Sequence, residues 1–272
     1  MLYYYSYAII YTMSAELTGL VIAKDEAVDL PGCLQSLQRV CAEIVVIDNE
    51  STDATPEIAM SFGSRVVARA MSETDGFAGL RNAGLEEVRT SHVLVLDADE
   101  LPTEHLISSI SKVMEEGRTD VAYAVNRRNN AFGGYLDHGR FCGDQQTRLF
   151  SSDVRYTGIV HETPVLTEDI EVIELEGDLE HFTYNSLAEY IAKMRDYAEK
   201  QAQTLADPPS LKHMIGIPAY NAIVRQGYKD GWRGLAMAVG DGWHDHLLRK
   251  YHQRQHAKDS SMAKGLSRVL QA

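Results

Sequence analysis

The sequence contains few cysteines and no redox or metal-binding pattern built on them. Its three cysteines, Cys33, Cys41 and Cys142, form no C-x-x-C pair and no even-numbered framework. We therefore predict buried thiols in a reducing compartment, hence a cytoplasmic protein, rather than a disulfide or zinc scaffold. The chain also has no apolar run long enough to cross a membrane as a helix, so a membrane-spanning protein is not indicated.

Several common enzyme motifs are absent as well. There is no G-x-G-x-x-G and no G-x-x-x-x-G-K-[ST], which argues against a dinucleotide-binding sheet and against a P-loop enzyme. The "HET" at 161–163 is not the H-E-x-x-H of a zinc protease. Internal repeats and low-complexity tracts are also missing from the sequence.

The first residues, "MLYYYSYAIIYTM", lack the basic region and the small-residue cleavage site of a signal peptide. They are also too few to span a bilayer. We predict that Met13 is the true start and that residues 1–14 are a disordered extension or a mis-annotated leader.

Charge is unevenly distributed along the chain, whose net charge is −13. Residues 225–272 carry nine Lys or Arg against four Asp or Glu, a net of +5, while the rest carries 17 basic and 35 acidic residues, a net of −18. An acidic body argues against nucleic acid as a partner. The basic end is compatible with peripheral contact with an anionic membrane, such as the inner face of the plasma membrane.

Strand and helix patterns alternate in the first part of the chain. Apolar runs predict strands at 17–23, 43–48, 64–68 and 92–97, with helical patterns in 28–40, 55–63 and 77–88 between them. This order predicts an α/β fold with a mostly parallel sheet flanked by helices. In such sheets ligands bind beyond the carboxyl ends of the strands, where Asp48 and Asp97 lie.

The pattern changes after a helix predicted near 103–116. Strand-like segments at 121–126, 147–150 and 169–177 are not separated by regular helices. A helix is predicted at 186–206, since Ser186 and Glu189 form a capping-box pattern at its start. We predict an α/β domain at 15–205 and a helical C-terminal extension at 206–272.

The strongest candidate site is "VLVLDADELP" at 93–102. A buried strand that ends in Asp97, Asp99 and Glu100 crowds carboxylates, which repel one another and are costly to bury. A divalent metal ion such as Mg²⁺ or Mn²⁺ would account for them, because such ions take oxygen ligands and bridge phosphates. The alternative for a D-x-D pattern alone is a solvated acidic turn.

Two further segments suit a nucleotide. Asp48, in "DNESTDAT", could accept a hydrogen bond from a nucleobase, and Asp53 could bind a ribose or order the loop. Arg81, in "GFAGLRNAGL", could meet a diphosphate. The alternatives are helix capping in "STDAT" and a surface arginine.

These segments together resemble a known family. "VIAKDEAVDLPGCLQSL", "EIVVIDNESTDAT", "GFAGLRNAGLEEV", "VLVLDADELP" and "DQQTRLF" followed by "VHE" occur in this order. The set resembles family 2 glycosyltransferases of the GT-A fold, and most closely the bacterial lipopolysaccharide-core β-1,4-glucosyltransferase-like group. The resemblance covers about 17–200 and is weaker in "RQGYKDGWRGL" at 225–235. One departure is Asp25, where the group usually has Asn.

The resemblance implies a role for each matching position. The implied nucleotide-sugar-binding residues are Glu26, Asp48, Asp53, Arg81 and Asp97; the metal ligands are Asp99 and His161; and the catalytic candidates are Asp144 and Glu162. Either Asp144 or Glu162 would be the base that deprotonates the acceptor. The alternative, structural roles are an ion pair of Asp144 with Arg148 and a salt bridge or loop hydrogen bond of Glu162. His181, in "EHFTY", is read as a packing or loop residue.

The resemblance predicts an inverting glycosyltransferase that uses a divalent metal, Mg²⁺ or Mn²⁺. It would move a hexose, glucose in our prediction, from a nucleoside diphosphate sugar, with UDP favoured, to a hydroxyl of a glycan or lipid-linked acceptor. One rival is a nucleotidyltransferase, which usually has a Gly- and basic-rich loop that "AKDEAVDL" does not match. Another is a non-catalytic sugar-nucleotide-binding protein, against which the retained Asp97, Asp99, Asp144 and His161 argue.

The aromatic residues of the C-terminal region permit two interpretations. Trp232, Trp243 and Tyr251 lie among Arg and Lys residues, as in segments at a membrane interface. The alternative is a set of helices packed on the catalytic domain or on a dimer partner.

Overall fold

The computed structural model describes residues 14–72, 74–158 and 162–269, which form two compact units. The first unit contains the described residues up to 127 together with 143–181, and the second contains 128–142 and the described residues from 182 onward. The expected boundary at 205/206 therefore lies inside the second unit. Of the predicted leader at 1–14, residues 1–13 are outside the described residues, and Ser14 begins the first strand; the candidate ligand His161 is also outside the described residues.

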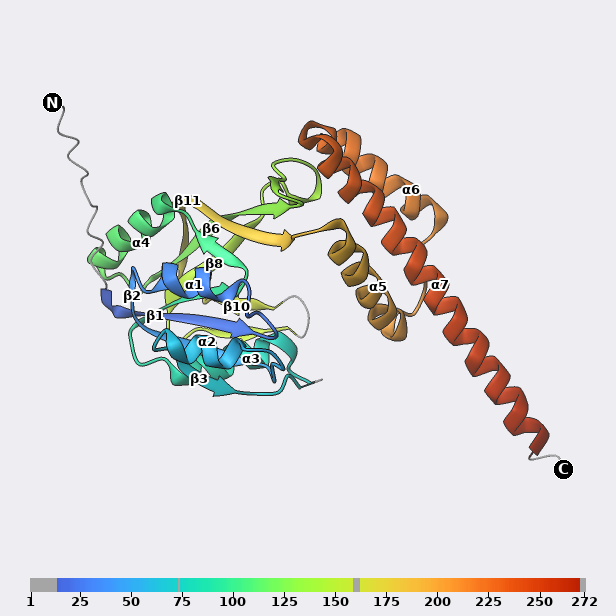
Figure 1. The fold of residues 1–272 in the computed structure, drawn as a ribbon, viewed down its shortest axis with the longest axis horizontal. Coiled ribbons are helices and arrows are strands. Elements are labelled where there is room, and N and C mark those ends of the chain that lie inside the picture. Colours follow the sequence, from blue (N-terminus) through green and yellow to red (C-terminus); the bar gives the residue numbers. More distant parts are fainter. Residues whose placement is uncertain (1–13, 73, 159–161, 270–272) are drawn as a thin grey trace. The chain divides into compact units, whose positions relative to one another are not determined.

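A parallel half-sheet forms the start of the first unit (Figure 1). Its strands are β1 (Ser14–Ala23), β2 (Cys41–Asp48), β3 (Arg65–Ala68) and β4 (His92–Asp97), in the order β3-β2-β1-β4. In the register of this sheet Ala23 pairs with Asp48 and Ile22 pairs with Asp97. The two aspartates therefore lie at the same edge of the sheet, on either side of β1, as the strand-end pattern predicts.

Helices cover both faces of this half-sheet. Helices α1 (Leu30–Leu37), α2 (Thr55–Ser61) and α4 (Glu104–Glu116) share one core with Leu94 and Leu96, whereas α3 (Gly76–Glu87) shares the opposite core with Val93 and Val95. Alternate residues of β4 thus point to opposite faces, and both faces are apolar because both are covered. The expected α/β class is confirmed.

The rest of the sheet is antiparallel. Strand β8 (Gln145–Ser151) pairs with β4 and β6 (Val121–Ala131), and β5 (Glu100–Pro102) pairs with β11 (Glu171–Tyr184). The sheet of nine described strands is therefore mixed rather than mostly parallel, because β8, β6, β11 and β5 join it through antiparallel pairs. The minor strands are β7 (Gly134–Tyr135), which joins β6, and the pair β9 (Arg155–Thr157) and β10 (Thr163–Val165).

The second unit is mainly helical, as expected of the C-terminal region. It contains α5 (Leu187–Thr204), α6 (Leu211–Ala219), the π-helical turn η2 (Tyr220–Val224) and α7 (Gly231–Val269), with α6 lying along α7 (Figure 1). Ser186 Oγ accepts a hydrogen bond from the Glu189 N–H at 3.1 Å, so the predicted cap begins α5. In the described part of the chain, every helix is too short or too polar to span a membrane.

Candidate active site

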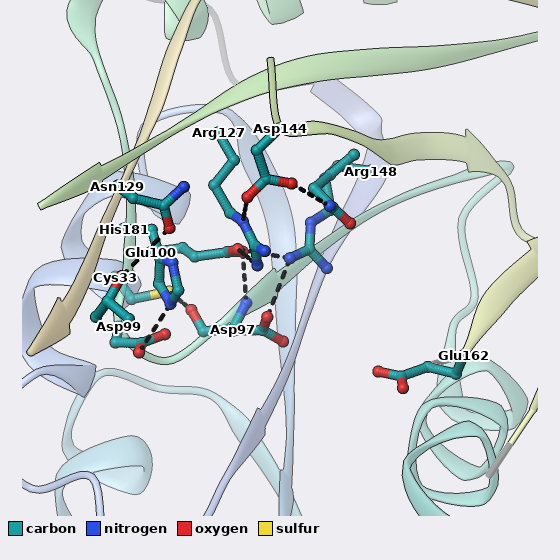
Figure 2. A network of polar contacts seen from close by, with 12 residues as sticks. Cys33, Asp97, Asp99, Glu100, Arg127, Asn129, Asp144, Arg148, Glu162 and His181 are labelled. Carbon is teal, nitrogen blue, oxygen red and sulfur yellow. Dashed lines mark hydrogen bonds and ion pairs between the residues drawn. The ribbon is translucent and has the colours of Figure 1, made fainter. Parts of the chain in front are cut away.

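The acidic turn after β4 contains one structural carboxylate. Glu100 is fully buried, and its Oε2 accepts a hydrogen bond from the Asp97 N–H at 2.9 Å. Its Oε1 lies 2.5 Å from Arg148 Nη2 and 3.3 Å from Arg127 Nη1. Two guanidinium groups therefore compensate the charge of Glu100, the third acid of "DADE". Through these ion pairs Glu100 holds the turn in place. Figure 2 shows this network.

The turn belongs to a longer series of ion pairs in which the charge alternates. The series runs Glu162, Arg81, Asp97, Arg148, Glu100, Arg127, Asp144. Asp97 lies 2.6 Å from Arg81 and 3.0 Å from Arg148, and Asp144 lies 2.8 Å from Arg127. The two candidate bases thus stand at the two ends of one charge network.

Burial alone would raise the pKa of Asp97, but Arg148 and Arg81 outweigh it and hold that pKa well below its ordinary value. Asp97 is therefore ionised throughout the neutral range. With both oxygens bound to arginines, its carboxylate acts here as a fixed anchor of the site.

Asp99 points to a different partner. Its Oδ2 lies 3.2 Å from His181 Nε2, and the two side chains are 24% and 14% exposed. His181 reaches this position because it pairs with Glu100 in the β5–β11 ladder. His181 was expected to be a packing or loop residue rather than a ligand. It lies on strand β11 rather than in a loop, and a ligand role for it stays a prediction.

Carboxylate oxygen and imidazole nitrogen are both accepted by Mn²⁺, so Asp99 and His181 suit the expected divalent metal in chemical type. Within the described residues, no larger group of His, Cys, Asp or Glu forms a metal-binding cluster. A donor diphosphate and water would have to supply the remaining ligands.

Asp48 has an unused acceptor. Its side chain is buried, and Oδ2 accepts a hydrogen bond from the Ser51 N–H at 3.3 Å. Oδ1 is buried and has no hydrogen-bond partner among the described residues. Since buried polar atoms are normally satisfied, this oxygen marks a place where a ligand donor fits.

Asp53 orders the loop after β2, one of its two expected roles. Its Oδ1 accepts from the Thr55 N–H at 2.9 Å, and its Oδ2 accepts from the Ala27 N–H at 3.1 Å. Thr55 Oγ1 in turn accepts from the Glu26 N–H at 2.8 Å, so Glu26 is held beside the same loop. The hydrogen bonds from Thr55 lower the pKa of Asp53.

Asp25 has a left-handed backbone, with φ of 56°, and its carboxylate accepts from the Thr52 N–H at 2.6 Å. Asn and Asp both tolerate this conformation, so the Asp25 departure from the family pattern is accommodated.

Arg81 is buried rather than displayed on the surface. Its two terminal nitrogens contact Asp97 and Glu162. This geometry suits a residue that positions two carboxylates, and diphosphate binding by Arg81 stays a prediction.

The positions of Arg127, Arg148 and His181 in this site were not predicted from the sequence. Asp144 pairs with Arg127 rather than with Arg148, the partner considered from the sequence. A possible signal for Arg148 was a lone arginine in the apolar strand segment "TRLF".

Comparison with known proteins agrees with the expected family. The family described as glycosyl transferase family 2 matches residues 20–163, more than half of the chain. An uncharacterized glycosyltransferase of Rickettsia bellii is 24% identical over 71% of this chain and 68% of its own length. The lipopolysaccharide core biosynthesis glycosyltransferase LpsC of Rhizobium meliloti is 28% identical over 80% of this chain and 83% of its own.

Solved structures are similar only at low identity. TarS 1–349 of S. aureus is 13% identical, with a TM-score of 0.45, over 89% of this chain and 92% of that one. Glucosyl-3-phosphoglycerate synthase of Mycobacterium tuberculosis, in complex with Mn²⁺, UDP-glucose and phosphoglyceric acid, is 18% identical, with a TM-score of 0.34, over 44% of this chain and 45% of that one. Both TM-scores are below 0.5, so the assignment rests on the family match and the relatives. This chain belongs to glycosyl transferase family 2 and is a glycosyltransferase.

Proposed function

We propose that the enzyme transfers a hexose from a UDP-sugar to a hydroxyl of a glycan or lipid-linked acceptor, with inversion at the anomeric carbon. Glucose is the hexose we propose. One observation carries the proposal: the unpartnered Asp48 Oδ1 lies at the same sheet edge as the D-x-D turn. Membership of a glycosyltransferase family argues against the nucleotidyltransferase and the non-catalytic alternatives.

Asp48 would select the nucleobase. Uracil carries a ring N–H flanked by two carbonyl oxygens, and the buried Oδ1 is an acceptor suited to that donor. The loop held by Asp53 and Thr55 would bring Glu26 and Ser51 to the ribose side of the nucleoside.

Asp99 and His181 would hold the metal ion, and His161, the ligand expected from the family, stays a prediction. A divalent ion would stabilise the charge of the nucleoside diphosphate leaving group. Asp97, fixed by Arg81 and Arg148, would accept hydrogen bonds from the donor without changing its own protonation.

A carboxylate would deprotonate the acceptor hydroxyl as the bond to the sugar forms. We keep Asp144 as the base and Glu162 as its rival. Each is paired to an arginine, Asp144 to Arg127 and Glu162 to Arg81, and this pairing holds each carboxylate in place.

The acceptor would be met in the cytoplasm, at the inner face of the plasma membrane. The relative LpsC is named for lipopolysaccharide core biosynthesis, whose product is a glycolipid, which supports a lipid-linked acceptor here. The enzyme would then reach its acceptor by peripheral contact with an anionic membrane through its helical unit.

A panel of nucleotide sugars tests this proposal. The full-length enzyme would be incubated with UDP-, GDP- and TDP-sugars and Mn²⁺, and release of the nucleoside diphosphate would be measured with and without EDTA. We expect release from a UDP-hexose that EDTA abolishes. Release only from GDP- or TDP-sugars, or undiminished release in EDTA, would contradict the UDP or the metal assignment respectively.

A further inference from the structure

Helix α6 is apolar yet unburied. Its sequence is LKHMIGIPA, and none of its nine residues, all of them described, is buried. Leu211 and Ile215 are 64% and 72% exposed, and four residues apart they share one face of the helix. A helix of a globular protein normally turns such a stripe toward the core.

The apolar exposure continues beyond α6. In η2 Ile223 is 68% exposed, and at the start of α7 Trp232, Leu235 and Val239 are exposed as well. These α7 residues are spaced i, i+3 and i+7, so they form one stripe. A Cβ at Gly242 of α7 would lie 2.7 Å from the Met214 carbonyl oxygen of α6, so the two helices are in close contact. We call Leu211, Ile215, Ile223, Trp232, Leu235 and Val239 the hairpin patch.

The other aromatic residues considered from the sequence do not belong to this patch. Trp243 packs beside the buried Met194 and Met237, and Tyr251 packs beside the buried Ala198 and Leu248. The inward face of α7 thus supplies the core of the unit. The outward stripe stays exposed, although Trp232 stacks on Phe132 with 5.5 Å between the ring centroids.

Basic residues lie among the patch residues in the sequence. Between 210 and 239 the chain has Lys212, Arg225, Lys229 and Arg233 against the single acid Asp230, a net of +3. Asp230 accepts from His138 Nδ1 at 2.7 Å. The remaining residues carry 22 basic and 38 acidic side chains, a net of −16. An anionic surface would therefore attract this segment and repel the rest of the chain.

We propose that the hairpin patch is a peripheral binding surface for an anionic lipid bilayer. The apolar side chains would enter the boundary between headgroups and acyl chains, and the lysines and arginines would meet lipid phosphates. Lysine is depleted in protein–protein interfaces, so a second copy of the chain suits this surface less well. The inference deepens the proposed function, because a lipid-linked acceptor would be met at this surface, but its test needs no catalytic activity.

Vesicle sedimentation of the full-length protein tests the proposal. Vesicles of phosphatidylcholine alone would be compared with vesicles containing about 30 mol% phosphatidylglycerol. We expect binding to the anionic vesicles only, weakened at about 0.5 M KCl. The double variant Ile215→Ser/Val239→Ser should lose at least about tenfold in partitioning, because it removes apolar groups that the boundary would bury.

A matched variant, Met60→Ser/Val172→Ser, removes two exposed apolar side chains from the first unit. It should bind vesicles like the wild type, and circular dichroism would verify the fold of both variants. Equal binding by the two variants, or no binding by the wild type, overturns the proposal. A second result would also overturn it. In that result the wild type binds no vesicles but forms a dimer in analytical ultracentrifugation, and the patch variant, unlike the matched variant, does not form the dimer. A protein that binds vesicles but releases no nucleotide would contradict the proposed function and leave this surface intact.

Discussion

At the scale of single residues, the Asp99–His181 pair is the proposed binding site of the metal ion. The two side chains come from elements far apart in sequence and meet at 3.2 Å on the turn that the family pattern assigns to the donor diphosphate. Replacing His181 by Ala should therefore weaken Mn²⁺-dependent UDP binding by about tenfold or more. Binding without metal should change little, since His181 would act only through the ion.

Calorimetry of UDP binding with and without Mn²⁺ would measure this effect. His105→Ala is the control, because His105 is 65% exposed and its ion pair among the described residues is with the exposed Glu176. If the His181→Ala enzyme kept the full gain in affinity from Mn²⁺, His181 would have no part in the metal site.

Single substitutions can also distinguish whether Asp144 or Glu162 is the catalytic base. Asp144→Asn keeps the size of the side chain and the hydrogen bond from Gln146 but cannot take the acceptor's proton. If Asp144 is the base, the rate of sugar transfer should fall by about 10²–10⁴-fold with little change in donor affinity. Transfer rates and donor affinity would be measured on the same preparations.

Glu162→Gln is the paired variant for this prediction. Its main expected effect is on the orientation of Arg81, its partner, and so on donor binding rather than on the chemical step. A fast Asp144→Asn enzyme beside an inactive Glu162→Gln enzyme with normal donor affinity would reverse the assignment.

At the scale of elements, the β4–β5 turn depends on Arg148 of β8. Arg148 is buried between Asp97 and Glu100, so Arg148→Gln leaves the fully buried Glu100 with Arg127 alone. Removing one partner from a buried ion pair typically costs about 3–5 kcal/mol of unfolding free energy. Urea denaturation of the variant should show a loss of this size.

The exposed pair Arg39–Glu104 is the control for Arg148. Its two hydrogen bonds are also short, at 2.6 Å, but its side chains are 33% and 72% exposed. Arg39→Gln should cost under about 1 kcal/mol, because water screens an exposed pair. Similar losses for both variants would show that the buried network does not hold the turn.

A second element-scale feature is the close approach of β11 to α4. Gly177 has φ of 99°, and a Cβ there would lie 2.8 Å from the Leu106 Cα. Gly177→Ala should therefore lower the unfolding free energy by more than about 2 kcal/mol, since backbone strain and backbone overlap combine.

Gly117 is a control that distinguishes backbone strain from backbone overlap. It also has positive φ, 61°, but a Cβ there would meet no described atom within 4 Å beyond its own chain neighbours and helix backbone. Gly117→Ala should cost only about 1 kcal/mol. Equal melting temperatures for the two alanine variants would contradict the close approach of β11.

At the scale of the whole molecule, the first half of the fold was predictable from the sequence. The strands at 17–23, 43–48 and 92–97 are short runs with a mostly apolar centre, as expected of buried strands covered on both faces. The D-x-D turn and Asp48 followed from strand ends, because carboxyl ends of parallel strands share an edge.

The remainder was less predictable, because it depends on contacts between distant segments. Strand β11 extends to Tyr184, beyond the predicted 169–177, and only its pairing with β5 places His181 at Asp99. Local patterns contain no information on such a register. Likewise the chain enters the second unit at 128 and again at 182, so a single boundary at 205/206 could not describe it.

The central claim is that the carboxyl edge of the sheet binds a metal-bound UDP-sugar, and a crystal structure of the full-length enzyme with UDP-glucose and Mn²⁺ tests it most directly. We predict that the uracil N–H donates a hydrogen bond to Asp48 Oδ1, the atom now buried without a partner among the described residues. We also predict that Mn²⁺ binds Asp99 and His181. A nucleotide bound away from Asp48, or a metal ion that touches neither Asp99 nor His181, would contradict the account.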